Sequence, residues 1–337
     1  MLPRHAPLAR AVQMNCDIAD AHHAHEATLC TYLLQMREFH CWERGLPLAA
    51  QPARQDVSRW IAEREAAWEA LETAHYAPLP LGPRLHDPFD AASLNREIGA
   101  EGMVYGAGYG RFHRPHFFLA ELERSETREG MRVLVAGREH ARDLSAMPAA
   151  LQGDTIHVRR DALRRWLREK VDFWRSRRTT GALAQAIESW GLAAGDEAAF
   201  ERTVDAEIET LILHELGEAR AGCKLGTAWE EMLFGLEDRR AEILARAVRD
   251  NLADCLSTLP ALIERDARAS LHFWFSQLDG MRRELFPALA GAYVAWRDSG
   301  RAAALSDAIR AGAAHWERVA RALLASPERA DARALAL

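Results

Sequence analysis

Three polar side chains that can bind or activate a metal ion lie close together, at His214, Glu215 and Glu218. In a helix, residues four apart project from one face about one turn apart, which is the geometry that two ligands of one metal ion require. Glu215 lies next to that face, where a general base could hold a water activated by the metal. The spacing therefore indicates a metal site with His214 and Glu218 as ligands and Glu215 as general base.

The charge on this segment indicates that something outside it must compensate. Apart from His214, the only charged side chain at helical spacing from Glu215 or Glu218 is the other carboxylate, a repulsion of roughly a few tenths of a kcal/mol. A bound cation would offset it, and so would an arginine from another element, because a guanidinium can bind a carboxylate through two hydrogen bonds. Arg37 is our candidate for such an arginine. A non-catalytic structural or interaction protein with a buried arginine–carboxylate network is therefore one alternative.

The same segment resembles the zinc helix of zincin metallopeptidases, H-E-x-x-H, with glutamate in place of the second histidine. Downstream, RAVRDNLADCLSTL (246–259) is similar to the helix that supplies the third ligand in the glutamate-ligand branch of zincins. The strand-like DTIHVRRDAL (154–163) precedes the motif, as a strand does in that family. The resemblance covers residues 104–257 and implies a zincin-like arrangement.

The resemblance also implies that Asp250 is the third metal ligand and Asp254 a supporting residue, although zincins have glutamate at the third position. If Asp250 is a ligand, its carboxylate should approach His214 to within roughly 4 to 6 Å even without metal, because a preformed site holds its ligands nearly in place. Arg246, one turn before Asp250, is the expected partner of that carboxylate, whereas Asp254 has no local cation.

These residues predict a metal-dependent hydrolase that acts on a small-molecule or peptide substrate. One imidazole and two carboxylates form a harder and more anionic ligand set than that of zincins, so one divalent ion is expected, either zinc or, with a relative preference, iron or manganese. A second alternative is a helical non-haem iron oxidase or oxygenase. Its carboxylates would be Glu26, Glu207, Glu218 and Asp254.

Two further phrases of the sequence, CTYLLQMRE (30–38) and HELGE (214–218), resemble an uncharacterised bacterial family that is recognised by its sequence pattern alone. This resemblance implies no activity.

Composition limits the classes of protein to which this chain can belong. The formal net charge is −6 with a pI near 6.2, so the basic surplus of a nucleic-acid-binding protein is missing. The sequence has no run of about 18 uncharged apolar residues and no secretory leader, so we expect neither a membrane span nor export. Five scattered cysteines fit reduced thiols. We therefore expect a cytoplasmic protein, whose oligomeric state the sequence leaves open.

Hydrophobic periodicity predicts a mainly α-helical chain with a small mixed β-sheet in the middle, an α+β protein. We expect a helix over 17–44 that begins at Asp17 or Asp20, and strands within 116–137 and 154–163. After residue 161 the pattern is helical, including 197–222, 237–257 and 267–297. This order suggests an N-terminal helical layer (1–98), a mixed segment with the motif helix (99–260) and a C-terminal helical segment (261–337), which could form one compact unit.

The segment VYGAGYGRFHRPH (104–116) places three glycines two residues apart, followed by basic residues. The glycines match neither a dinucleotide-binding fingerprint nor a phosphate-binding loop, so we expect a turn before a strand. If that turn covers the metal site, His113 and His116 are the best candidates to line the cleft.

Overall fold

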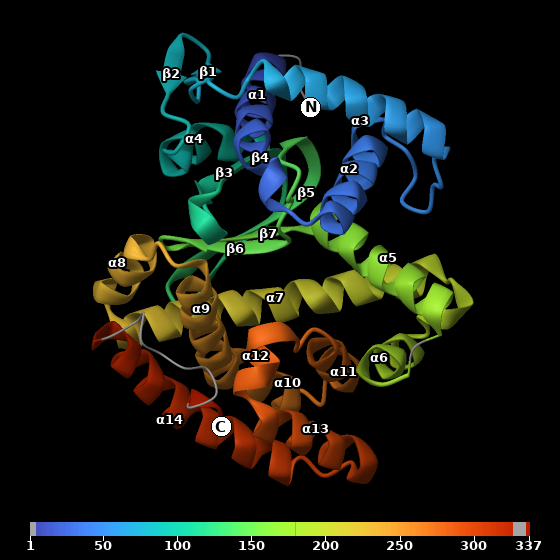
Figure 1. Ribbon diagram of the computed structural model, residues 1–337, viewed down its shortest axis with the longest axis vertical. Helices are drawn as coiled ribbons and strands as arrows, with labels where there is room; N and C mark the ends of the chain where they lie inside the picture. The colour runs from blue at the N-terminus through green and yellow to red at the C-terminus, as the bar shows by residue number, and fades with distance from the viewer. Residues whose placement is uncertain (1–4, 179, 326–334) are drawn as a thin grey trace. The chain divides into compact units, whose positions relative to one another are not determined.

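The computed structural model describes residues 5–178, 180–325 and 335–337. The chain forms two compact units, one comprising Met1–Arg128 with Arg132–Arg168 and the other Glu129–Met131 with Glu169–Leu337. These limits differ from the division into 1–98, 99–260 and 261–337. The expected fold class is confirmed, since helices predominate and the strands form one small mixed sheet and a hairpin (Figure 1).

The N-terminal unit contains a five-stranded sheet of order β3-β4-β5-β7-β6 and a separate β1-β2 hairpin. Strands β5 and β7 are parallel, whereas β3 pairs with β4, and β6 with β7, in antiparallel fashion. The elements of this unit are α1 (Ala6–His23), α2 (Leu29–Glu43), α3 (Arg54–Glu69), β1 (Leu79–Leu81), β2 (Arg84–His86), α4 (Ala91–Ile98), β3 (Met103–Tyr109), β4 (Pro115–Arg128), β5 (Met131–Arg142), β6 (Ala149–Gln152) and β7 (Thr155–Arg159). Helix α5 (Arg160–Arg177) follows and continues past the end of this unit.

The single helix predicted over 17–44 is two helices. Helix α1 ends at His23, and α2 begins after Thr28, whose hydroxyl accepts a hydrogen bond from the Thr31 amide and caps the new helix. Asp20, one of the two predicted caps, lies instead inside α1 and is fully buried. Its carboxylate accepts hydrogen bonds from Arg114 at 2.6 Å and from the Leu144 amide at 2.8 Å.

The predicted turn before a strand is present at residues 110–114, directly before β4, but the glycines at 106 and 108 lie in strand β3. Strand β3 contains Gly106 and Gly108, and a Cβ atom at Gly106 would collide with the Phe118 ring of β4. A Cβ at Gly108 would lie 2.5 Å from the side-chain nitrogen of Gln152. The glycines therefore let neighbouring side chains lie across the strand, which explains their alternate spacing.

The C-terminal unit is helical over most of its described length, with the motif on its longest helix, α7. Its further elements are α6 (Ala182–Trp190), α7 (Glu197–Leu225), α8 (Thr227–Gly235), α9 (Arg239–Ala253), a π-helical turn (Asp254–Thr258), α10 (Leu259–Glu264), α11 (Arg268–Ser276), α12 (Gly280–Leu285), α13 (Pro287–Ser299) and α14 (Ala303–Ala325). The helix predicted over 267–297 is thus α11, α12 and α13, with Pro287 beginning the last of them.

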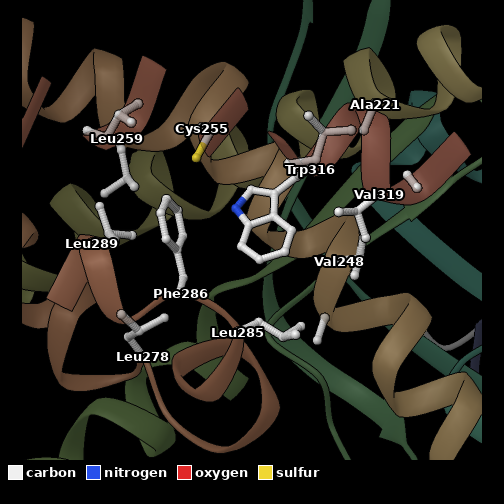
Figure 2. Packing of buried hydrophobic residues seen from close by; sticks show 14 of the residues in the cluster. Ala221, Val248, Cys255, Leu259, Leu278, Leu285, Phe286, Leu289, Trp316 and Val319 are labelled. Atoms are coloured by element: carbon white, nitrogen blue, oxygen red, sulfur yellow. The ribbon is translucent and has the colours of Figure 1, made fainter. Parts of the chain in front are cut away.

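The hydrophobic core of this unit is centred on Phe286 and Trp316, which are both fully buried (Figure 2). Their rings meet edge to face, with centroids 5.3 Å apart. Cys255, in the π-helical turn, lies beside them, and Gly312 of α14 leaves room for both Phe286 and the Cys255 sulfur. This packing fixes the turn that follows α9 against α14.

Helix α7 lies close to the end of α9 at Gly217, the fourth residue of the motif. A Cβ atom there would collide with the carbonyl oxygen of Ala253, and it would lie 2.8 Å from the carbonyl carbon and 3.1 Å from Cβ of Ser257. Only glycine therefore permits the contact without a backbone shift. The contact places the motif face of α7 against the end of α9 and the π-helical turn.

We predict that Gly217→Ala destabilises the protein by about 1–3 kcal/mol, because the added methyl group forces two backbones apart in a packed region. Gly222→Ala is the matched control on the same helix, since a Cβ there meets nothing within 4 Å. It should stabilise the helix by up to about 1 kcal/mol. Urea unfolding of both variants measures the difference, and equal effects would contradict the close-approach argument.

Candidate metal centre

The three predicted ligands lie together in the C-terminal unit. His214 and Glu218 come from α7 and Asp250 from α9, and one ligand atom from each lies within 4.8 Å of the others. The expected approach of Asp250 to His214 is therefore confirmed. Among the described residues this is the one group of three or more histidine, cysteine or acidic side chains that is close enough to hold a metal ion.

Asp254 orients the imidazole of His214. Oδ1 of Asp254 lies 2.9 Å from Nδ1 of His214, and this carboxylate is buried, with 1% of its side chain exposed. Burial would raise the pKa of Asp254, but His214 and Arg282 hold it at about 2, so the carboxylate is ionised and can only accept. Nδ1 must then donate. Nε2 faces Glu218, whose Oε1 is 3.6 Å away.

Arginines of two neighbouring helices neutralise the carboxylates. Nη2 of Arg249 on α9 lies 2.5 Å from Oε1 of Glu218 and 3.4 Å from Oδ1 of Asp250. Arg282 on α12 donates to the second oxygen of Asp254. Although burial would raise the pKa of Glu218, Arg249 and His214 lower it to about 2. The buried acids of this cluster are therefore paired.

The arginines that pair with these acids are not the ones predicted from the sequence. The arginine that pairs with Glu218 is Arg249, whereas Arg37 lies in the N-terminal unit and donates to Gln51 at 2.7 Å. Arg246 was expected to pair with Asp250, but its Nε donates to Glu242 at 2.7 Å. The expected compensation is present, but it comes from helix packing at Gly217, which spacing along the sequence could not show.

Glu215, the predicted general base, is buried, with 6% of its surface exposed. Burial is the main cause that raises its pKa to about 8, and Glu218 raises it further, while His214 and Arg249 oppose the shift. Glu215 therefore carries a proton at neutral pH in the metal-free protein. A cation bound nearby would favour its ionised form.

The carboxylates around His214 favour its imidazolium form. Burial by itself would lower its pKa, but Asp254 and Glu218 outweigh that effect and raise the pKa well above the usual value. Because a metal binds the neutral ring, metal binding at this site must release that proton.

The other predicted site residues have different surroundings. His113 and His116, the candidates for the cleft, belong to the N-terminal unit, where Nδ1 of His116 lies 3.1 Å from the Asp143 carboxylate. Of the carboxylates suggested for an iron oxidase, Glu26 contacts His23 at 3.1 Å and Asp254 contacts His214. Glu207 accepts a hydrogen bond from Thr210 at 3.4 Å, so Glu218 alone of the four belongs to the triad.

The donor set fits a hard divalent cation, but Arg249 already contacts two of the three ligands. A metal ion therefore has to displace the Arg249 guanidinium from Glu218 and Asp250. Sequence reasoning missed both arginines of the cluster. Arg249 directly precedes Asp250 and could have been considered, whereas Arg282 has no signal in its spacing from the motif.

Fold and site together define a mainly helical α+β protein with a histidine–carboxylate cluster on two closely packed helices. The chain belongs to the Family of unknown function (DUF6866), whose N-terminal domain matches residues 7–159 and whose C-terminal domain matches residues 164–337. No curated protein and no solved structure matches the chain. The zincin-like arrangement therefore stays a prediction.

The described helices were also compared with the requirements for a membrane span. Within residues 5–178 and 180–325, none combines the length and the apolar character needed to cross a bilayer.

A second buried acid on α7, Glu207, generates a prediction about pH. It is 3% exposed, and burial raises its pKa from 4.5 to about 8, although Ser270 and Thr210 partly oppose the shift through hydrogen bonds. Between these two values the folded chain holds a proton that the unfolded chain has lost. Its contribution to stability is therefore present below pH 4.5 and is lost as the pH rises towards 8.

Glu207→Gln removes this dependence and should make the protein more stable than the wild type at pH 8, but not at pH 4.5. The difference should grow by up to about 1 kcal/mol for each pH unit in that window. Urea unfolding at several pH values measures it, with Glu231→Gln on the exposed surface of α8 as control. A difference that does not change with pH would show that Glu207 titrates normally.

Proposed function

We propose that the C-terminal unit binds one divalent cation through His214 Nε2, Glu218 and Asp250 and uses it in hydrolysis of a small-molecule or peptide substrate. The observation that carries this proposal is the contact between Asp254 and Nδ1 of His214. Histidines that bind metals usually donate their second ring nitrogen to such a carboxylate, which fixes the tautomer and the orientation of the ring. Here Nε2 lies 3.6 Å from Oε1 of Glu218, and one ligand atom each of His214, Glu218 and Asp250 lies within 4.8 Å of the others.

The neighbouring residues support hydrolytic chemistry. A divalent cation held by His214, Glu218 and Asp250 would polarise the bond under attack and lower the pKa of water. Glu215, once ionised, would accept the proton of the attacking water and deliver it to the leaving group, a role that suits a carboxyl whose pKa is about 8 without metal. A ligand set of two carboxylates and one imidazole suits manganese or iron. Zinc competes for the same site, because divalent zinc generally binds such ligands more tightly than manganese or iron does.

Asp250→Asn tests the metal site with little disturbance of the metal-free protein, because Asp250 makes the longer of the two Arg249 contacts, at 3.4 Å. We expect the variant to bind manganese and zinc at least about tenfold more weakly than the wild type, since it loses an anionic ligand. Calorimetric titration and elemental analysis of untagged protein measure this. Glu231→Gln serves as the control, and unchanged metal affinity of Asp250→Asn would remove Asp250 as a ligand.

A structural role without metal is the second candidate. It is favoured by the 2.5 Å contact between Arg249 and Glu218, which already neutralises the central carboxylate. In that case the cluster is a buried ion-pair network that joins α7, α9 and α12. Breaking such a network by removing one partner typically costs about 3–5 kcal/mol.

Arg249→Met separates the two candidates. Removing the arginine leaves Glu218 and Asp250 without their cation, so the metal-free variant should be less stable under either proposal. If the site binds metal, added manganese or zinc replaces the missing charge and restores the urea midpoint, with an affinity at least equal to that of the wild type. If the network is purely structural, no divalent ion restores stability. Magnesium is the control ion, because its ligands are mainly water and carboxylate oxygens and it rarely binds an imidazole nitrogen.

A further inference from the structure

We propose that Arg249 is the residue that recognises the substrate, and that the substrate therefore carries an oxyanion, a carboxylate or a phosphate. This inference rests on the proposed metal site. In the metal-free protein Arg249 neutralises Glu218 and Asp250, and once a cation takes these ligands its guanidinium is available to an anion beside the metal.

The hydrogen bonding of Arg249 in the structure supports a second partner. Its Nη2 atom makes the contacts to Glu218 and Asp250, whereas its Nε atom is buried and has no hydrogen-bond acceptor. A buried donor without an acceptor costs about 1–3 kcal/mol, so such an atom calls for a partner that is absent here. Two neighbouring N–H groups of one guanidinium match the two oxygens of a carboxylate or phosphate.

The position of Arg249 also suits a ligand that enters from solvent. Its side chain retains 21% of its exposure, and Glu218 beside it retains 13%, so the pair lies at the edge of the packed helices. Asp254, which orients His214, is 1% exposed, whereas its partner Arg282 retains 22% of its exposure. Both arginines therefore lie at the edge of the packed helices, and Arg249 is the one that contacts two of the proposed metal ligands.

Titration of the full-length, manganese-loaded protein with acetate and, separately, with inorganic phosphate tests the inference. At least one of the two anions should bind about tenfold more tightly to the loaded protein than to the metal-free protein, and the stronger arm identifies the oxyanion. In the protein loaded with diamagnetic zinc, the Nε–H resonance of Arg249 should shift when the anion binds, a signature that a structural role would not produce. Equal binding of both anions with and without manganese would overturn the inference.

Arg249→Lys keeps the positive charge but lacks the planar pair of donors. We expect it to hold manganese and to bind the preferred anion at least about tenfold more weakly, while Arg310→Lys on the exposed surface of α14 behaves as the wild type. Should Arg249→Lys fail to fold, the wild type supplies the test: the inference requires its Arg249 Nε–H resonance to shift when the anion binds, and an unchanged resonance overturns it. Full manganese content without anion binding overturns this inference alone. A wild-type chain that binds no manganese or zinc overturns the proposed function, and this inference with it.

Discussion

The close approach of α7 to the backbone of Ala253 at Gly217 determines the arrangement of the whole cluster. Any larger residue would push the helices apart, and then His214 would no longer reach Asp254, nor would Glu218 reach Arg249. The glycine inside the motif is thus a packing residue, and the chemistry of its neighbours depends on it. Because ligands of one metal must lie within a few ångströms of each other, a shift of this size between helices would remove the site.

Two kinds of cation can neutralise the carboxylates of this cluster, an arginine side chain and a divalent metal ion. Buried carboxylates are costly unless a positive charge lies beside them, and Glu218 and Asp250 have that charge in Arg249. A divalent cation would meet the same requirement with the same oxygens. The metal-binding and structural interpretations therefore share one set of contacts and differ in the cation that occupies them. The positions of the acids fit both interpretations, whereas the hydrogen bond from His214 Nδ1 to Asp254 favours the metal.

Sequence reasoning succeeded where helical spacing was sufficient. Residues 214 and 218 could be assigned to one helical face because residues four apart lie about one turn apart, whereas Asp250 was implied by the resemblance to zincins. The strands within 116–137 and 154–163 follow from their pattern. Sequence reasoning failed where a contact between distant segments determines the environment of a residue. Asp20 looks like a helix cap but is buried against Arg114, and the glycines of β3 look like a turn but accommodate Phe118. The choice of Arg249 over Arg37 depends on packing in the same way.

The turn that follows α9 has a cause in the sequence that connects the fold to the cluster. Pro260 has no amide hydrogen, so it cannot continue the regular hydrogen-bond ladder, and the carbonyl of Leu256 accepts a hydrogen bond from Arg220 of α7 instead, at 2.6 Å. The chain widens into a π-helical turn in which the Leu259 amide donates to the Asp254 carbonyl. Such turns often occur at functional sites. Here the widened turn begins at Asp254, so the irregularity that the proline imposes lies at the residue that orients His214.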